Sequence, residues 1–127
     1  DAEQVQNGLA GKSIKLIDAR TPERFSGRQE PIDPVAGHVP GALNRPFQCN
    51  LQADGRFKAA QELRDEWSGL IDATPSEQVV HMCGSGVTAC HNLLAMDISG
   101  FAGSKLYAGS WSEWIRNKNR PVVTEST

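Results

Sequence analysis

The sequence predicts a single α/β domain built on a largely parallel sheet. Short apolar runs that are typical of strands alternate along the chain with segments that carry helix-forming residues at helical spacing. The 127 residues fall within the usual size of one domain, and a chain of this length can bury a core without disulfide bonds. No stretch approaches the ~20 consecutive apolar residues of a membrane span, so no membrane segment is expected.

The first expected elements are a strand and a short helix. Residues 13–18 alternate in polarity and then become apolar, which is typical of a strand that ends at Asp18. Thr21 is a suitable N-cap and the proline after it suits the first helical position, so a helix is expected to begin there and to end before Gly27. Residues 29–41 contain three prolines and two glycines, which predicts a loop.

The rest of the chain continues the alternation of strands and helices. In chain order, the pattern predicts a strand over 42–47, a helix over 59–67, a buried strand over 79–82, a helix over 89–98, a strand over 105–107 and a helix over 110–116. We therefore expect one domain over residues 1–120 and a C-terminal tail over residues 121–127.

Charge and cysteine content limit the classes of function. Thirteen Lys and Arg against 15 Asp and Glu give a net charge of −2, so binding to nucleic acid through bulk charge is not expected. The three cysteines form an odd set without a Cys-x-x-Cys motif, which favours a reducing, cytoplasmic location over a secreted disulfide framework. The first residues have no signal-peptide pattern, and the start at Asp1 without Met leads us to expect a fragment of a longer chain.

The segment that follows the buried strand carries the strongest chemical signal. Cys83 stands where the strand ends, and Gly84 and Gly86 follow before the next helix starts. Such a loop can direct several backbone N–H groups at one centre close to the helix start. Those donors would stabilise a thiolate and make Cys83 a nucleophile. The residue pattern alone leaves a tight turn with a buried, inert cysteine equally open.

Two other cysteine chemistries fit this segment less well. A cysteine phosphatase loop needs an arginine six residues after the nucleophile to clamp phosphate, but that position holds Ala89. A zinc site would draw on His81, Cys83, Cys90 and His91, whose spacing matches no common zinc pattern. A metal site is therefore not expected.

Three separated segments, in order along the chain, carry a family resemblance. They are residues 16–25 with the Glu-Pro pair at 30–31, the Gly-His-Val-Pro-Gly-Ala run at 37–42, and the Cys83 loop together with residues 107–114. With these segments the sequence resembles a rhodanese-family sulfurtransferase, most closely the catalytic second domain of tandem 3-mercaptopyruvate and thiosulfate sulfurtransferases. The resemblance implies a three-layer domain with a central, mostly parallel sheet flanked by helices. It also implies a second rhodanese domain in the parent chain.

The resemblance implies a reaction as well. Cys83 would take the sulfane sulfur of a small anionic donor as a persulfide and pass it to a thiol or cyanide-like acceptor, without a cofactor. The loop 83–88 is similar to that of 3-mercaptopyruvate sulfurtransferases, whereas thiosulfate-preferring relatives usually carry basic residues there. Residues 32–36, where animal mercaptopyruvate enzymes have a second substrate arginine, contain no arginine. Mercaptopyruvate and thiosulfate therefore both remain candidate donors.

The resemblance also assigns roles to individual residues. Arg24 matches the family arginine that contacts the anionic substrate, a role that suits a guanidinium group with its parallel donors. Arg20 and Arg28 are weaker candidates on the same segment, with Arg20 in a supporting role. Asp18 matches an acid at the end of the first strand and is expected to accept hydrogen bonds from backbone near the active loop. The remaining predicted substrate-binding residues are Gly84, Ser85, Gly86, Val87 and Thr88.

Structural roles are expected for several other residues. His38 is predicted to fix the Gly-His-Val-Pro-Gly turn, and His81 is predicted to be a core histidine with satisfied hydrogen bonds. Cys90 is predicted to be buried, and Trp111 and Trp114 are predicted to pack in the core.

A function of another class stays open. A non-catalytic rhodanese module could dock a partner or sense redox state through Cys83. The complete loop with its cysteine favours the enzyme, whereas the absence of a companion domain from the sequence favours reduced activity.

Overall fold

The computed structural model describes residues 1–84 and 87–124. Within them a four-stranded sheet has the order β2-β1-β3-β4, and every neighbouring pair is parallel. The strands in that order are β2 (Leu43–Asn44), β1 (Lys15–Asp18), β3 (Val79–Met82) and β4 (Lys105–Leu106). The α/β class with a parallel central sheet is thereby confirmed.

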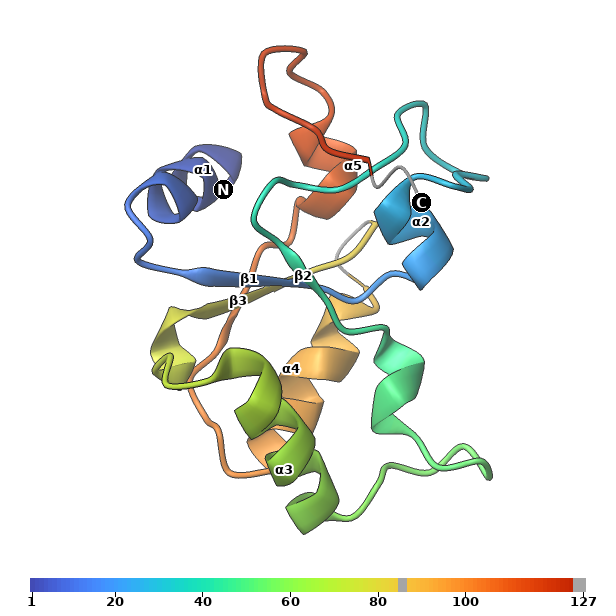
Figure 1. The fold of residues 1–127 in the computed structure, drawn as a ribbon, viewed down its shortest axis with the longest axis vertical. Coiled ribbons are helices and arrows are strands. Elements are labelled where there is room, and N and C mark those ends of the chain that lie inside the picture. The colour runs from blue at the N-terminus through green and yellow to red at the C-terminus, as the bar shows by residue number, and fades with distance from the viewer. Residues whose placement is uncertain (85–86, 125–127) are drawn as a thin grey trace.

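Helices cover both faces of the sheet and make three layers (Figure 1). One face carries α1 (Ala2–Ala10), α2 (Pro22–Ser26) and α5 (Ser110–Trp114). The other face carries α3 (Ala60–Ile71) and α4 (Ala89–Ile98), and two short 3₁₀ helices, η1 (Phe47–Asn50) and η2 (Ser76–Gln78), lie in the connections. None of the helices within the described residues is long and apolar enough to span a membrane.

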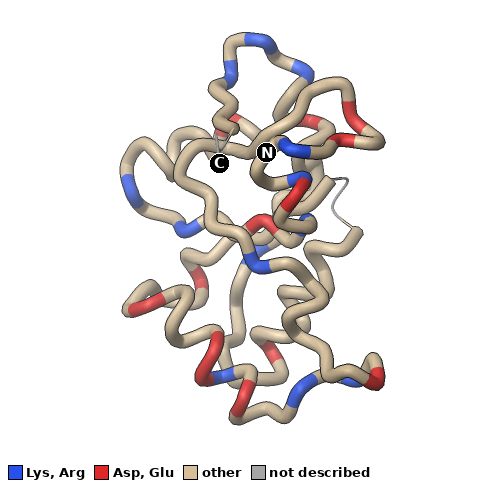
Figure 2. Tube along the Cα trace, turned by 45° about the vertical axis from the view of Figure 1, so that its right-hand side comes forward, with Lys and Arg blue, Asp and Glu red and all other residues tan. Residues whose placement is uncertain are grey.

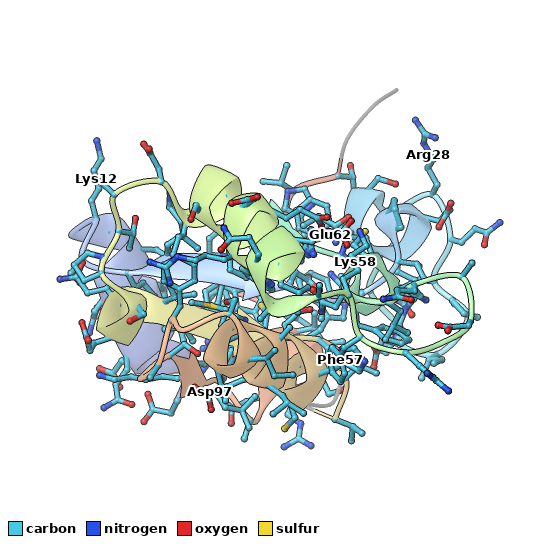
Figure 3. The ribbon with its side chains drawn as sticks, turned by 90° about the horizontal axis from the view of Figure 1, so that it is seen from below. Lys12, Arg28, Phe57, Lys58, Glu62 and Asp97 are labelled. Atoms are coloured by element: carbon cyan, nitrogen blue, oxygen red, sulfur yellow. The ribbon has the colours of Figure 1, made fainter. Side chains whose placement is uncertain are left out.

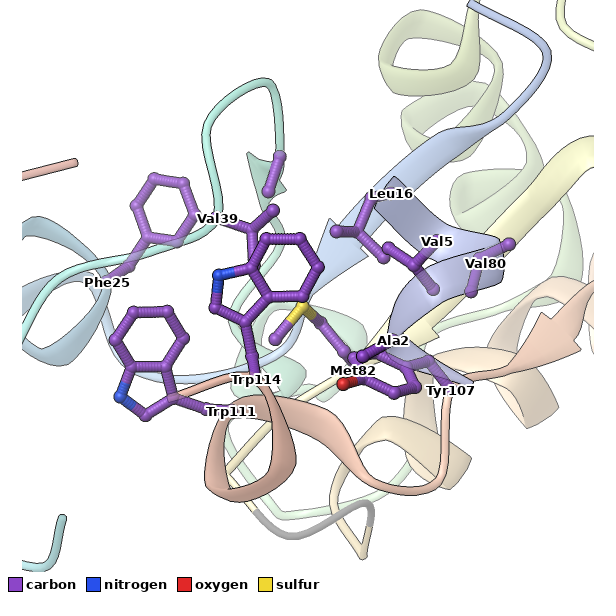
Figure 4. Close-up of a cluster of buried hydrophobic side chains, with 11 residues drawn as sticks. Ala2, Val5, Leu16, Phe25, Val39, Val80, Met82, Tyr107, Trp111 and Trp114 are labelled. Atoms are coloured by element: carbon purple, nitrogen blue, oxygen red, sulfur yellow. The ribbon is translucent and has the colours of Figure 1, made fainter. Parts of the chain in front are cut away.

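Alternate residues of β1 and β3 build two cores, because successive strand side chains point to opposite faces. Leu16 and Met82 belong to the core beneath α1 and α5, which also contains both predicted packing tryptophans, Trp111 and Trp114 (Figure 4). The core beneath α3 and α4 is made of Ile17, Leu63, Trp67, Ile71, Val79, Ala95 and Met96.

The register of the two central strands decides which loops meet. Asp18 pairs with Met82 at the carboxyl ends of β1 and β3, and the N–H of Ala19 donates to the carbonyl of Met82 at 2.8 Å. The residues after Asp18 and after Met82 therefore leave the sheet at the same edge, which is where α/β proteins commonly place their sites.

Helix α1 is not among the elements predicted from the sequence. Asp1 caps it by accepting from the Gln4 N–H, and the Gln4 side chain accepts in turn from the Asp1 backbone, which forms a capping box. Val5 is buried against the sheet from this helix. The Asp-x-x-Gln spacing, followed by apolar residues four positions apart, is the sequence pattern that would have predicted this helix.

Several predicted boundaries are wrong. The strand expected over 42–47 is confined to Leu43–Asn44, because Pro46 has no N–H to donate to the sheet and η1 begins at Phe47. The helix expected over 59–67 continues to Ile71, whose side chain completes the buried face of α3.

The described part of the predicted tail lies against the domain. His38 and Val123 exchange both backbone hydrogen bonds at 2.9 Å, and the indole N–H of Trp114 donates to the Pro121 carbonyl at 2.9 Å. Gly37 makes this approach possible, because its φ is +118° and a Cβ there would lie 2.6 Å from the Val123 carbonyl oxygen. The division of the chain at residue 120 stays a prediction.

Candidate active site

Cys83 follows the last residue of β3 and is 1% exposed. It packs with Ala19 and Ala89, and the ring of Phe47 lies against this group. The helix α5 fixes its backbone. The Cys83 N–H donates to the Ser110 hydroxyl at 3.1 Å, and the Cys83 carbonyl accepts from the N–H of the next residue of α5 at 3.0 Å. The cysteine is therefore held in place by residues far away in the sequence.

A cavity of about 170 Å³ opens beside Cys83. Four predicted site residues, Arg24, Gly84, Val87 and Thr88, line it together with the cysteine. Ser85 and Gly86, which are also predicted to bind substrate, lie outside the described residues. Three further lining residues are Ile32, Asp33 and Ser112, to which the sequence pattern assigns no role.

Arg24 reaches this cavity from α2. Thr21 caps the helix and the helix ends before Gly27, as the sequence predicts, and Gly27 adopts the left-handed conformation. The guanidinium group lies against Gly84, where an added Cβ would be 3.3 Å from Arg24 Nη2. A side chain at position 84 would therefore crowd the arginine.

Two carboxylates hold the Arg24 guanidinium. Nη2 donates to Glu30 Oε2 at 3.0 Å and to Asp33 Oδ2 at 3.1 Å. The Arg24 side chain is 18% exposed, and its buried Nε has no hydrogen-bond partner among the described residues. Arg24 is thus already paired before any ligand binds.

The carboxylates are held in turn by the loop that carries them. Glu30 Oε2 also accepts from the backbone N–H groups of Ile32 and Asp33, at 3.2 and 3.1 Å. Burial alone would raise the pKa of Glu30, but these N–H donors and Arg24 together lower it below its usual value. Asp33 Oδ1 lies 3.3 Å from the Ser112 hydroxyl, which also donates to the Gly84 carbonyl at 2.9 Å.

Asp18 and Arg20 lie beneath the site instead of in the cavity. The Asp18 carboxylate accepts from the Arg20 backbone N–H and from its guanidinium group, so its expected bonds to backbone near the active loop are not found among its described contacts. Arg20 also donates to the Gly37 carbonyl at 2.7 Å and lies over the Trp111 ring at 4.7 Å. Arg28 is exposed at the periphery and does not line the cavity (Figure 3).

The two histidine predictions have different outcomes. His38 fixes its turn as predicted, because its Nδ1 lies 2.7 Å from the Phe25 carbonyl oxygen and its ring stacks on Phe25. His81 is fully buried, but neither ring nitrogen has a hydrogen-bond partner within residues 1–84 and 87–124. The prediction of a satisfied histidine is therefore wrong for the described contacts. Burial lowers the pKa of His81 to about 4.

The prediction that Cys90 is buried is also wrong. Cys90 is exposed, because α4 turns the side chains of Ala89, Asn92 and Met96 inward. In the described part of the chain, no three His, Cys, Asp or Glu side chains come together as metal ligands could.

The charge around Arg24 is not that of a simple anion site. Three carboxylates (Asp18, Glu30 and Asp33) contact two guanidinium groups (Arg20 and Arg24), so this cluster has a net charge of −1 when all are ionised. Acidic and basic residues are also interspersed along the rest of the chain in Figure 2. Any attraction of an anionic ligand therefore depends on local geometry.

Known proteins resemble this chain over nearly its whole length. The family model described as "Rhodanese-like domain" matches residues 1–117. A probable 3-mercaptopyruvate sulfurtransferase of Pseudomonas aeruginosa is 51% identical over 124 residues, which is 98% of this chain and 44% of that protein. The thiosulfate sulfurtransferase of Rattus norvegicus is 39% identical over 118 residues, 90% of this chain and 39% of that protein. The chain spans less than half the length of these curated relatives.

Solved structures agree on the fold. The Tum1 protein of Saccharomyces cerevisiae superposes with a TM-score of 0.78 at 26% identity, covering 97% of this chain and 43% of that chain. An EanB variant in complex with ergothioneine superposes with a TM-score of 0.85 at 18% identity, covering 98% of this chain and 31% of that chain. At that identity, the second match supports the fold alone.

Proposed function

Because the chain belongs to the rhodanese-like domain family, we propose that it carries out sulfur transfer through a persulfide on Cys83. The observation that carries this proposal is that Cys83, at the buried end of β3, and Arg24 line one cavity. A relative that is 51% identical over 124 residues is named a probable 3-mercaptopyruvate sulfurtransferase, which supports the same chemistry.

The proposed loading step balances with either donor. With thiosulfate, the Cys83 thiolate attacks the outer sulfur, a new S–S bond forms, and sulfite leaves with the electron pair of the broken bond. With 3-mercaptopyruvate, the Cys83 thiolate attacks the donor sulfur and a new S–S bond forms while the C–S bond breaks. The electron pair of the C–S bond stays on carbon, and the proton of the donor thiol ends on that carbon to give pyruvate. Both routes leave the persulfide Cys83–S–S⁻.

In this proposal the residues around the cavity have distinct tasks. Arg24 binds the carboxylate or sulfonate group of the donor with charge-assisted hydrogen bonds. Gly84 leaves room for that guanidinium, and the backbone N–H groups of residues 84–88 stabilise the thiolate and the persulfide. For Ser85 and Gly86 this assignment rests on the sequence alone. Asp18 and Arg20 support the site by fixing the loop that carries Glu30.

Sulfur leaves in a second step. An acceptor thiolate attacks the outer sulfur of the persulfide, the Cys83 thiolate leaves, and the acceptor becomes a persulfide, whereas cyanide would become thiocyanate. We propose 3-mercaptopyruvate as the better donor, because the described residues of the loop carry no cation that would favour the doubly charged thiosulfate. A second rhodanese domain in the parent chain and a reducing, cytoplasmic location belong to the same proposal.

Intact mass spectrometry tests the proposal on the 127-residue chain itself. After incubation with each donor, wild-type protein should gain ~32 Da, the mass of one sulfur atom on the nucleophile. Cys83→Ser should gain nothing, whereas the exposed-cysteine controls Cys49→Ser and Cys90→Ser should load like the wild type.

Two outcomes would contradict the mechanism. An adduct that persists in Cys83→Ser would place the sulfur elsewhere. A wild-type protein that is folded by circular dichroism but gains no sulfur from either donor would favour a non-catalytic module that docks a partner.

A further inference from the structure

Asp33 stands where an anionic donor would have to bind. Asp33 lines the cavity beside Cys83, its side chain is 11% exposed, and its Oδ2 lies 3.1 Å from Arg24 Nη2. The same Nη2 contacts Glu30 Oε2 at 3.0 Å, so this terminal nitrogen already serves two carboxylates. A donor carboxylate or sulfonate must displace Asp33 or share Arg24 with it.

Glu30 holds the backbone of the loop around Asp33. The Asp33 backbone N–H donates to Glu30 Oε2 at 3.1 Å, and the Ile32 N–H donates to the same oxygen. Glu30 is also the more deeply buried acid, with 5% of its side chain exposed. Glu30 therefore holds the backbone of the loop, whereas the described side-chain contacts of the Asp33 carboxylate are to Arg24 and Ser112, which both line the cavity.

The rim of the cavity gives no charge to compensate for Asp33. Ile32 and Val87, which both line the cavity, are 76% and 75% exposed. Arg24 is the only cation among the described lining residues, and the Cys83 thiolate would add a further negative charge. Since Coulomb energy is proportional to ligand charge, this arrangement penalises a dianion twice as strongly as a monoanion.

We propose that Asp33 is a specificity-determining residue that selects sulfur donors by charge, favouring monoanions over dianions. The inference rests on the proposed sulfur transfer and specifies its substrate class. Asp33 competes with the donor for Arg24 Nη2 and repels its anionic group. The competition favours donors that carry a single carboxylate, such as 3-mercaptopyruvate, over thiosulfate.

The test compares donors of different charge on Asp33→Asn and Asp33→Glu. Neutralising Asp33 should raise kcat/KM about threefold for 3-mercaptopyruvate and about tenfold for thiosulfate, because doubling the ligand charge squares the factor. The change should lie in KM, with kcat nearly constant, since the repulsion acts on the bound donor and on the transition state alike. Asp33→Glu keeps the charge and should restore the wild-type donor preference.

Asp97→Asn is the matched control, because it makes the same chemical change on the exposed surface of α4 (Figure 3). It should leave the ratio of the two donors unchanged. If Asp97→Asn changed the kcat/KM ratio of the two donors as much as Asp33→Asn does, the effect would come from the net charge of the protein and not from the position of Asp33. If kcat/KM in Asp33→Asn changed equally for both donors, or fell for both, Asp33 would have a structural role and the proposal would be overturned.

A binding measurement separates this inference from the proposed function. Calorimetric titration of thiosulfate and of pyruvate into Cys83→Ser, with and without Asp33→Asn, needs no turnover. If wild-type protein gains no persulfide from either donor, the proposed function fails, and these titrations still decide the role of Asp33. If persulfide forms but Asp33→Asn does not improve thiosulfate binding relative to pyruvate, the charge selection fails alone.

Discussion

Replacement of Arg20 by alanine should cost the protein a large part of its stability. The Arg20 side chain is 1% exposed and its partner Asp18 is 0% exposed, so water screens this ion pair very little. Arg20 donates to both oxygens of Asp18, with distances of 2.8 to 3.1 Å, and to the Gly37 carbonyl at 2.7 Å. The guanidinium group also lies 4.7 Å above the centre of the Trp111 ring.

The size of the effect follows from what the substitution leaves behind. In Arg20→Ala, the buried carboxylate of Asp18 keeps only the backbone N–H of residue 20 among its described donors. Removing one partner of a buried ion pair costs about 3–5 kcal/mol, because the other charge stays buried without compensation. A domain has about 5–15 kcal/mol in total, so the expected loss is about a fifth of its stability or more.

Urea unfolding followed by tryptophan fluorescence measures this loss. The double variant Arg20→Ala/Asp18→Ala should be less destabilised than the sum of the single variants, because it no longer buries an unpaired charge. A loss below about 1 kcal/mol for Arg20→Ala, which is the range of exposed ion pairs, would refute the reasoning.

Two further predictions concern Arg24 and His81. Arg24→Ala should raise KM for anionic donors about tenfold to a hundredfold, the equivalent of a charge-assisted bond of ~1.5–3 kcal/mol, with little change in kcat in steady-state assays. An unchanged KM would place the anion site elsewhere. The folded-state pKa of His81, about 4, lies below its ordinary value of 6.5, so the unfolded chain binds the proton first and stability should fall as pH drops from 6.5 towards 4. The loss, about 3 kcal/mol at most, should be absent in His81→Leu when urea unfolding is repeated across this pH range.

Local chemistry made much of the fold predictable. The ends of α2 follow from Thr21, Pro22 and Gly27, and the strand β3 follows from its apolar run, as the structure confirms. The nucleophilic role of Cys83 is predicted in the same way, because a cysteine, two glycines and a helix start are adjacent in the sequence, and this role stays a prediction. These signals require no knowledge of distant contacts.

The wrong predictions concern side chains whose surroundings are set by residues far away in the sequence. Asn92 is a polar residue on the buried face of α4, where it accepts from Asn50 at 2.6 Å. This pair breaks the apolar spacing of the helix, so the sequence does not show that Cys90 faces outward. For His81, the apolar neighbours in the sequence predict burial, but no local pattern shows whether a hydrogen-bond partner lies near its ring nitrogens.

Asp33 could not be assigned for a related reason. It lies in a proline-rich loop without periodicity, and its approach to Arg24 depends on how that loop folds back. The path is set by Glu30 and by the bond from Arg20 to the Gly37 carbonyl. Sequence spacing gives the residues of such a site but not which charges face each other.

Glu30 connects the buried ion pair to the candidate active site. Its Oε1 lies 3.4 Å from Arg20 Nη1, and its Oε2 lies 3.0 Å from Arg24 Nη2. When Arg20 is lost, Glu30 keeps Arg24 as its guanidinium partner and should bind that group more tightly. The Arg24 guanidinium is then less available for hydrogen bonds to a donor. Arg20→Ala should therefore raise KM for anionic donors although Arg20 lies outside the cavity. An Arg20→Ala protein that loses stability but keeps its KM would show that Glu30 transmits nothing between the two arginines.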